Sequence, residues 1–282
     1  CRRDIRVGQG RDDQGAHQGA LRRRCEPRLY PAGESEWHVR RSALGRARST
    51  RGSRKVLGDF DGKVVVVTGA AGALGAAVAN EFAGRGATVA LVDIVATPPP
   101  HASFVGDLTD AQAAQRIVAD VTKKFGRIDA LANVAGGFTM GEAVHETTDT
   151  TWQFMFDLNV KTMLNMVRAT VPAMLAAGGG KIVNVGARAG LRGVGKMGAY
   201  CASKAVVIRL TESLADELKG RGINVNCVLP SIIDTARNRQ DMPSADPSKW
   251  VQPADLARAI AYLASNAAHA IHGVALPVEA LS

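Results

Sequence analysis

Four consecutive valines followed at once by a glycine-rich turn constrain this chain more than any other feature. Residues 63–75 read Lys-Val-Val-Val-Val-Thr-Gly-Ala-Ala-Gly-Ala-Leu-Gly, and residues 76–85 then carry Ala, Val and Phe at helical spacing. A strand made only of β-branched residues is typical of a parallel sheet that is covered on both faces. The order strand, tight turn, helix directs the unpaired N–H groups of a helix N-terminus at the turn, where they can hold a pyrophosphate. An ordinary βα connection without a ligand shows the same local pattern.

An acidic residue follows at the distance that a dinucleotide site requires. The expected second strand, residues 87–92, is followed directly by Asp93, close to the place where the dinucleotide fingerprint puts its carboxylate. A carboxylate at this place suits the ribose hydroxyls of NAD and repels the 2′-phosphate of NADP. No Arg or Lys lies between Gly69 and Gly75 to bind such a phosphate. The sequence therefore predicts that NAD(H) is preferred over NADP(H).

Segments typical of strands and helices alternate along the rest of the chain. We expect strands at residues 64–67, 87–92, 101–105, 128–134, 181–185, 223–229 and 274–278, and helices at 76–85, 110–125, 150–177, 199–219 and 253–265. This alternation predicts an α/β fold in one domain, a doubly wound, mainly parallel sheet of the Rossmann type with helices on both faces. Ligands of such sheets bind beyond the carboxyl ends of the strands.

The polar residues 236–250 are the expected substrate-covering loop. This loop carries Arg237 and Arg239. The two cations either pair with a carboxylate or phosphate of the substrate or are solvated surface charges.

The net charge of +9 resides entirely in the segment 1–56. This segment holds 15 Lys and Arg against 6 Asp and Glu, whereas the rest of the chain is neutral, so no nucleic-acid partner is expected. Few apolar residues and no clear periodicity predict that residues 1–56 are disordered, and the lack of an initiator Met favours an over-extended or artefactual start. Six acids and no amphipathic helix argue against a mitochondrial transit peptide. The catalytic domain is therefore expected at residues 57–282.

The chain shows no signal for a membrane, export or a metal. No apolar run approaches the length of a membrane-spanning helix and no signal-peptide core is visible, so we predict a cytoplasmic protein with no membrane partner. Cys201 and Cys227 lie in apolar segments and are expected to be reduced core thiols. The histidines lack the spacing to further ligands that a metal site needs, so no metal is expected.

Tyr200 and Lys204 are the sharpest candidates for chemistry. They lie four residues apart on an expected helix and so share one face. A neighbouring ammonium stabilises a phenolate and lowers the phenol pKa from about 10, so Tyr200 could exchange a proton with an alcohol oxygen. Tyr and Lys at this spacing also occur by chance on many helices. Asn159, flanked by Leu158 and Val160, either holds a helix break with a water that leads towards Lys204 or makes a plain core hydrogen bond.

In these residues the chain resembles the single-domain branch of the short-chain dehydrogenase/reductase family, from about Phe60 to its end. The matching elements are its cofactor loop (Thr68, Gly69, Ala73, Leu74, Gly75), its Asn-Asn-Ala-Gly element (Asn133, Val134, Ala135, Gly136), its catalytic asparagine, tyrosine and lysine (Asn159, Tyr200, Lys204) and its Pro-Gly-x-x-x-Thr nicotinamide clamp (Pro230, Ser231, Ile232, Ile233, Asp234, Thr235). Ala73, Val134 and Ser231 are departures that this pattern tolerates.

The resemblance implies hydride transfer between NAD(H) and a small-molecule alcohol or carbonyl. It also implies a homotetramer or homodimer built from the long helices that carry Asn159 and Tyr200. Tyr200 is the implied acid/base, Lys204 lowers its pKa and binds the nicotinamide ribose, and Asn159 orders the proton path. Asp107 is expected at the adenine edge, as a helix cap, or as both. The expected cofactor-binding residues are Gly69, Ala71, Gly72, Ala73, Leu74, Gly75, Asp93, Asp107, Leu108, Asn133, Ala135, Gly136, Tyr200, Lys204, Pro230, Ile233 and Thr235.

The main departure from the family is Ala187. The family places a serine at this position ahead of the tyrosine, where it hydrogen-bonds the substrate oxygen, and the segment 181–191 contains no Ser or Thr. Losing a positioned donor costs on the order of 10²–10³ in rate. Three interpretations stay open: an easily reduced or imine-like substrate, a substitute donor among Arg188, Arg192 and Thr139, or an NAD(H)-binding sensor or scaffold without alcohol turnover. The three retained catalytic residues favour the enzyme.

Overall fold

The computed structural model describes residues 58–282, which contain one parallel sheet of seven strands in the order β3-β2-β1-β4-β5-β6-β7. The strands are β1 Val64–Thr68, β2 Thr88–Asp93, β3 Ala102–Val105, β4 Ala130–Asn133, β5 Gly180–Val185, β6 Ile223–Pro230 and β7 Ala275–Val278. The predictions made for residues 1–56 lie outside the described residues.

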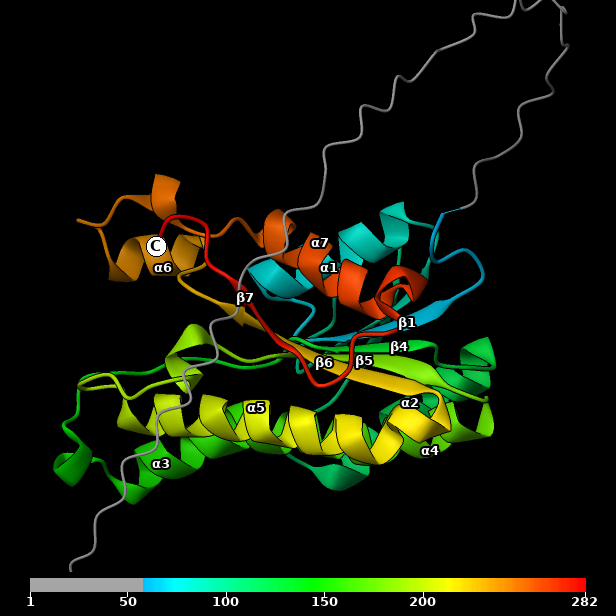
Figure 1. Ribbon diagram of the computed structural model, residues 1–282, viewed down its shortest axis with the longest axis horizontal. Helices are drawn as coiled ribbons and strands as arrows, with labels where there is room; N and C mark the ends of the chain where they lie inside the picture. The colour runs from blue at the N-terminus through cyan, green and yellow to red at the C-terminus, as the bar shows by residue number, and fades with distance from the viewer. Residues whose placement is uncertain (1–57) are drawn as a thin grey trace, which may run out of the picture. The chain divides into compact units, whose positions relative to one another are not determined.

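Helices cover both faces of the sheet, with α1 and α7 on one face and α2, α4 and α5 on the other (Figure 1). The helices are α1 Ala73–Gly84, α2 Ala111–Phe125, α3 Asp149–Phe156, α4 Thr162–Ala176, α5 Gly198–Leu218, α6 Ala236–Asp241 and α7 Pro253–Ala264. The predicted α/β fold with a doubly wound parallel sheet is confirmed. None of the helices between residues 58 and 282 has the length and apolar character needed to cross a membrane.

β1 lies at the centre of the sheet, between β2 and β4, and all five of its residues are buried. Val64 and Val66 pack into the core beneath α2, α4 and α5, whereas Val65 and Val67 pack into the core beneath α1 and α7. Successive side chains of a strand point to opposite faces, so a strand between two apolar layers must be apolar at every position. This is why the valine run marks the middle of the fold.

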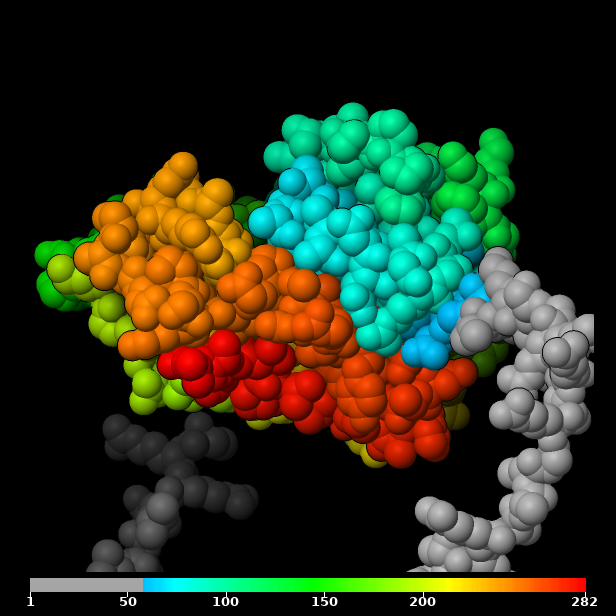
Figure 2. Space-filling view, turned by 90° about the horizontal axis from the view of Figure 1, so that it is seen from above, coloured from blue at the N-terminus to red at the C-terminus, as the bar shows by residue number. Residues whose placement is uncertain are grey.

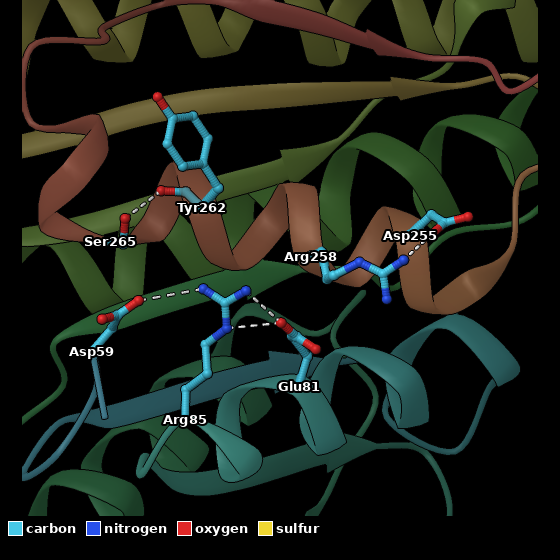
Figure 3. Close-up of polar contacts among 7 residues, drawn as sticks. All are labelled: Asp59, Glu81, Arg85, Asp255, Arg258, Tyr262 and Ser265. Atoms are coloured by element: carbon cyan, nitrogen blue, oxygen red, sulfur yellow. Dashed lines mark hydrogen bonds and ion pairs between the residues drawn. The ribbon is translucent and has the colours of Figure 1, made fainter. Parts of the chain in front are cut away.

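The layer formed by α1 and α7 is held mainly by apolar packing. The two helices lie side by side (Figures 1 and 2). Polar contacts occur at their surface: Arg85 donates to Glu81 at 2.7 Å and reaches Asp59 at 3.5 Å, and Arg258 pairs with Asp255 on α7 (Figure 3). Exposed pairs of this kind each contribute at most about 1 kcal/mol.

The long helix expected at residues 150–177 is present, but its α-helical repeat is interrupted. The segment consists of α3, a π-helical turn at Asp157–Lys161, and α4. A π-helical turn inserts one residue into the helical repeat and often marks a functional site. Asn159 lies inside this turn and is buried. The helix break considered for Asn159 is therefore present.

The expected loop at residues 236–250 contains regular structure. Residues 236–241 form α6, and Pro247–Lys249 form a 3-10 turn. Thr235 caps α6, because its hydroxyl oxygen accepts from the N–H of Asn238 at 3.1 Å. Arg237 and Asp241, one helical turn apart, pair at 2.8 Å.

Candidate active site

Two glycines allow a tight turn between β1 and α1. Gly69 has a φ of +66°, and a Cβ on it would lie 2.8 Å from the backbone of Ala135 in the loop after β4. A Cβ on Gly75 would overlap the carbonyl oxygen of Gly69. The hydroxyl oxygen of Thr68 accepts from the N–H groups of Val134 and Ala135 at 3.0 and 3.1 Å. The turn and the loop after β4 therefore form one continuous surface.

The first turn of α1 presents unpaired donors at this surface. α1 begins after Gly72 without a side-chain cap and without an acidic residue in its first turn. The N–H groups of Ala73, Leu74 and Gly75 have no acceptor in the part of the chain that the structure describes. A pyrophosphate satisfies such N–H groups and is attracted by the helix dipole. The turn thus fits the phosphates of a dinucleotide.

Asp93 ends β2 beside the same turn. Its Oδ2 accepts from the N–H of Ala71 at 2.9 Å, and its Oδ1 accepts from the N–H of Ile94 at 2.7 Å. A carboxylate offers about four acceptor positions, so Asp93 retains capacity for a ribose hydroxyl. The sequence pattern located Asp93 but gave no sign that it also fastens the glycine-rich turn.

Asp107 lies after β3, in the loop before α2. Its Oδ1 accepts from the hydroxyl and the N–H of Thr109, both at 2.8 Å, and these hydrogen bonds lower the pKa of Asp107. The cap of α2 is Asp110, so the capping role considered for Asp107 is wrong. Leu108, the next residue along, is buried in the core beneath α2, α4 and α5.

Tyr200 and Lys204 both lie on α5, as the spacing predicts. The ring of Tyr200 packs edge-to-face against Phe138, with centroids 4.8 Å apart, and burial raises the pKa of Tyr200 to about 12. Lys204 is buried, which lowers its pKa to about 8, and its Nζ donates to the carbonyl of Val185 at 2.9 Å. The expected lowering of the Tyr200 pKa by Lys204 is therefore not found here, because burial dominates.

Asn159 links the π-helical turn to α5 and to the loop after β4. Its Nδ2 donates to the carbonyl of Gly137 at 3.1 Å, and its Oδ1 accepts from the N–H of Gly137 at 3.0 Å. Its Nδ2 also donates to the hydroxyl oxygen of Ser203 at 3.1 Å, and this hydroxyl donates to the carbonyl of Tyr200 at 2.8 Å. Ser203 was missed by sequence reasoning, although its place between Tyr200 and Lys204 was a usable signal.

The end of β4 contacts the core, and the loop after it contacts the candidate site. Asn133 is buried, and its Nδ2 donates to Asn184 on the neighbouring strand at 2.9 Å, so this amide contacts β5. Gly136, in contrast, lies beside two of the candidate catalytic side chains. A Cβ on it would lie 2.8 Å from Asn159 Oδ1 and 3.2 Å from Lys204 Nζ. The absence of a side chain at position 136 therefore lets this loop approach Asn159 and Lys204.

Position 187 is buried and lies just beyond β5. The neighbouring Arg188 pairs with Glu279 at 3.0 Å and donates to the carbonyl of Ser282 at 3.3 Å. The C-terminal segment thus holds this guanidinium, which removes Arg188 from the substitute donors considered for the missing serine. The other two residues, Arg192 and Thr139, remain candidates for the donor that replaces the missing serine.

The expected nicotinamide clamp forms the end of β6 and the connection to α6. The hydroxyl of Ser231 donates to the carbonyl of Glu279 at 2.8 Å, and Ile233 pairs with Val251 in an isolated parallel bridge. The N–H of Leu281 donates to the carbonyl of Lys249 at 3.2 Å, and Figure 2 shows the red C-terminal residues against the orange segment that contains α6. The C-terminal residues therefore hold the expected clamp in place through these hydrogen bonds.

Both cations of the expected covering loop are already paired with acidic side chains of the protein. Asp234 accepts from Arg239 at 2.6 and 2.7 Å and from Gln252 at 3.0 Å, and these hydrogen bonds lower the pKa of Asp234 to about 2. Arg237 pairs with Asp241. Both guanidinium groups already have a carboxylate partner in the protein. The interpretation of Arg237 and Arg239 as ligands of an anionic substrate is therefore not supported.

Comparisons with known proteins agree with this architecture. The family described as short chain dehydrogenase matches residues 63–245. D-threitol dehydrogenase of Mycolicibacterium smegmatis is 35% identical over 241 residues, which cover 78% of this chain and 92% of that protein. Sorbitol dehydrogenase of Cereibacter sphaeroides is 38% identical over 185 residues, 62% of this chain and 72% of that protein. The crystal structure of carveol dehydrogenase from Mycobacterium avium in complex with NAD covers 79% of this chain and 98% of its own, with a TM-score of 0.72 and 29% identity.

The region that matches the family contains the elements of the candidate site. Residues 63–245 include the glycine-rich turn, the π-helical turn with Asn159, and the part of α5 that carries Tyr200 and Lys204. The similarity to D-threitol dehydrogenase extends over most of both chains. The chain belongs to the short chain dehydrogenase family.

Proposed function

We propose that the protein is an NAD(H)-dependent oxidoreductase that interconverts an alcohol and a carbonyl, with Tyr200 as its acid/base. The observation that carries this proposal is the meeting of Asn159, Lys204 and the backbone at Gly136, on the loop that also contacts the glycine-rich turn. The names of the threitol and sorbitol dehydrogenases support an alcohol substrate. No relative reported above is named a sensor or scaffold, so the alternative rests on Ala187 alone.

The residues at the carboxyl ends of the strands support NAD(H) as the proposed cofactor. The N–H groups at the start of α1 hold the pyrophosphate, and Asp93 accepts from the adenosine ribose and disfavours a 2′-phosphate. The NAD in the carveol dehydrogenase crystal supports this preference. When bound, the cofactor supplies or accepts the hydride. The further residues proposed to border it are Asp107, Leu108, Asn133, Ala135, Gly136, Pro230, Ile233 and Thr235.

The proton chemistry falls to Tyr200. In the oxidation direction the carbinol hydrogen leaves the alcohol as hydride, which bound NAD would accept, and the hydroxyl proton passes to the Tyr200 oxygen in its phenolate form, which produces the carbonyl. In the reverse direction the protonated phenol donates to the carbonyl oxygen. Because the pKa of Tyr200 is about 12, the phenol is protonated in the structure described here, which is the form needed for reduction. Lys204 is proposed to bind the nicotinamide ribose and then to lower this pKa, while Asn159 orders the proton path.

The family likeness extends the proposal in two further respects. We place the catalytic domain at residues 57–282 in a cytoplasmic protein. We also propose a homodimer or homotetramer formed through the helices that carry Asn159 and Tyr200.

A substrate screen tests the proposed function. Alcohols are offered with NAD and carbonyls with NADH, and the absorbance of NADH is followed, while NADH binding is measured separately by fluorescence. Turnover of at least one alcohol–carbonyl pair is expected. Binding without turnover of any pair would leave only a nucleotide-holding protein.

A further inference from the structure

Two short loops beside Tyr200 expose large apolar side chains. Five of the twelve large exposed hydrophobic residues between positions 58 and 282 lie at residues 138–144 and 191–194, and each is between 40% and 73% exposed. We call these five the apolar rim: Phe138, Met140, Val144, Leu191 and Val194. Single exposed apolar residues are ordinary on a protein surface, whereas a contiguous group marks a surface that binds something.

Three contacts connect the two loops of the apolar rim with each other, with Tyr200 and with the start of α5. The ring of Phe138 meets that of Tyr200 at 85° with 4.8 Å between centroids. The N–H of Gly141 donates to the carbonyl of Lys196 at 3.0 Å and so joins the two loops. Val144 lies against the first residue of α5, where a Cβ would come within 2.9 Å of its side chain. The rim is therefore continuous with the start of the helix that carries Tyr200.

Several polar side chains near the rim are already paired within the protein, whereas Thr139, between Phe138 and Met140, remains a substitute donor considered above. Glu142, between two rim residues, accepts from the N–H of Thr148 at 3.3 Å and from the hydroxyl of Thr151 at 3.0 Å. Arg188 is paired with Glu279, and the two arginines of α6 are paired as described above. Position 187 offers no hydroxyl. A polyol carries a hydroxyl on every carbon, and each one that a closed pocket leaves without a partner weakens binding strongly.

We propose, resting on the proposed function, that the substrate is an alcohol or ketone whose body next to the reacting carbon is apolar, and that the apolar rim selects it against polyols. The substrate tail covers the rim and removes its apolar area from water. Arg192 and Lys196 are exposed near the second loop. The proposal therefore describes only the part of the substrate next to the reacting carbon, and the far end of the substrate can carry an anionic group.

The first test compares kcat/KM for 2-decanol and D-threitol at saturating NAD. Both carry a secondary hydroxyl, and we expect a ratio of at least about 100 in favour of 2-decanol, since a single methylene in an apolar pocket is worth about 10-fold or more. Equal or better oxidation of D-threitol overturns the inference and leaves the proposed function standing. Failure of every alcohol while NADH still binds overturns the proposed function itself.

The second test changes the rim. In the double variant Met140→Ser with Leu191→Ser, the ratio of kcat/KM for 2-decanol to that for 2-butanol is expected to fall at least about 10-fold. Tyr262→Ser is the matched control, because Tyr262 is similarly exposed, at 44%, but lies on α7 across the sheet, and it should leave the ratio unchanged. An unchanged ratio in the double variant overturns the inference. The oligomeric state of the double variant is measured by size-exclusion chromatography. If the double variant dissociates where the parent does not, the rim is a contact between subunits, and this result overturns the inference whatever the ratio is.

Discussion

Asn159 and Ser203 lie 44 residues apart in the chain, yet the amide of Asn159 donates a 3.1 Å hydrogen bond to the hydroxyl of Ser203. The same amide group exchanges two hydrogen bonds with Gly137. One buried side chain thus fastens the π-helical turn, the loop after β4 and α5. Its contribution can be separated into stability and catalysis.

Replacing Asn159→Ala should lower both stability and turnover. The change leaves the N–H and carbonyl of Gly137 without their partner, so the free energy of unfolding should fall by about 1–3 kcal/mol in urea denaturation. Asn165→Ala is the matched control, because Asn165 is a buried asparagine of α4 that donates to the carbonyl of Leu108 at 2.9 Å. It should lose similar stability but keep its kcat. Equal kcat values in the two variants would remove Asn159 from the proton path.

Tyr200→Phe should abolish most turnover and spare cofactor binding. The phenyl ring keeps the edge-to-face contact with Phe138 but has no proton to exchange, so kcat should fall by about 10²–10⁴. NADH affinity, measured by fluorescence titration, should change only a few-fold. Tyr262→Phe, on α7, should leave both values as they are. Substantial turnover in Tyr200→Phe would mean that another group performs the proton transfer.

Ala187→Ser should raise the rate of ketone reduction. The buried position follows β5, and its neighbour Arg188 is engaged by Glu279, so an added hydroxyl would supply a donor that Arg188 does not. A positioned donor is worth on the order of 10²–10³ in rate, and an increase of about 10-fold or more is expected because the surroundings of Ala187 do not orient the new hydroxyl fully. Thr139→Ala is measured alongside. A loss of rate in Thr139→Ala, with no gain in Ala187→Ser, would identify Thr139 as the donor already in use.

Two substitutions of Asp93 separate its charge from its hydrogen bond to the turn. Asp93→Ala should weaken NADH far more than NADPH, because the ribose acceptor and the charge that repels a 2′-phosphate are both lost. Asp93→Asn keeps an oxygen that can accept from the N–H of Ala71, so it should retain more thermal stability than Asp93→Ala while also losing cofactor preference. Equal weakening of both cofactors in isothermal titration would reject the ribose assignment.

The buried Lys204 should make stability rise with pH. Burial lowers its pKa from 10.5 to about 8, so between these values the unfolded chain holds a proton that the folded chain has lost, and the free energy of unfolding increases. The Cys227 thiol, whose pKa burial raises from 9.0 to about 11, opposes this at higher pH. The free energy of unfolding of the parent minus that of Lys204→Met should therefore increase from about pH 7.5 to about pH 9. Parallel curves would show that Lys204 titrates normally in the fold.

The parts of the fold that the sequence predicted are those that depend on neighbouring residues. The valine run, the glycine-rich turn and the following helix are specified by local sterics and by burial on both faces. The four-residue spacing of Tyr200 and Lys204 likewise needs only the helical repeat. The fold class followed from the order of these elements, because parallel strands require crossover connections.

The features that were missed depend on contacts between distant residues. The packing of Phe138 on Tyr200 and the pairing of Arg188 with Glu279 join segments that are far apart in the chain. The polar character of residues 236–250 suggested a loop, but the cap by Thr235 and pairs one helical turn apart stabilise α6. No spacing rule contains this information, so the arrangement of the candidate site could not be predicted from the sequence.

The close approach of Gly69 to Ala135 has a consequence for biosynthesis. The two residues follow strands that are adjacent in the sheet but separated by a complete crossover, including β2, β3 and α2. A nascent chain from which Ala135 has not yet emerged lacks one wall of the proposed phosphate cradle. A bound nucleotide is therefore expected to stabilise only chains whose translation has passed Ala135.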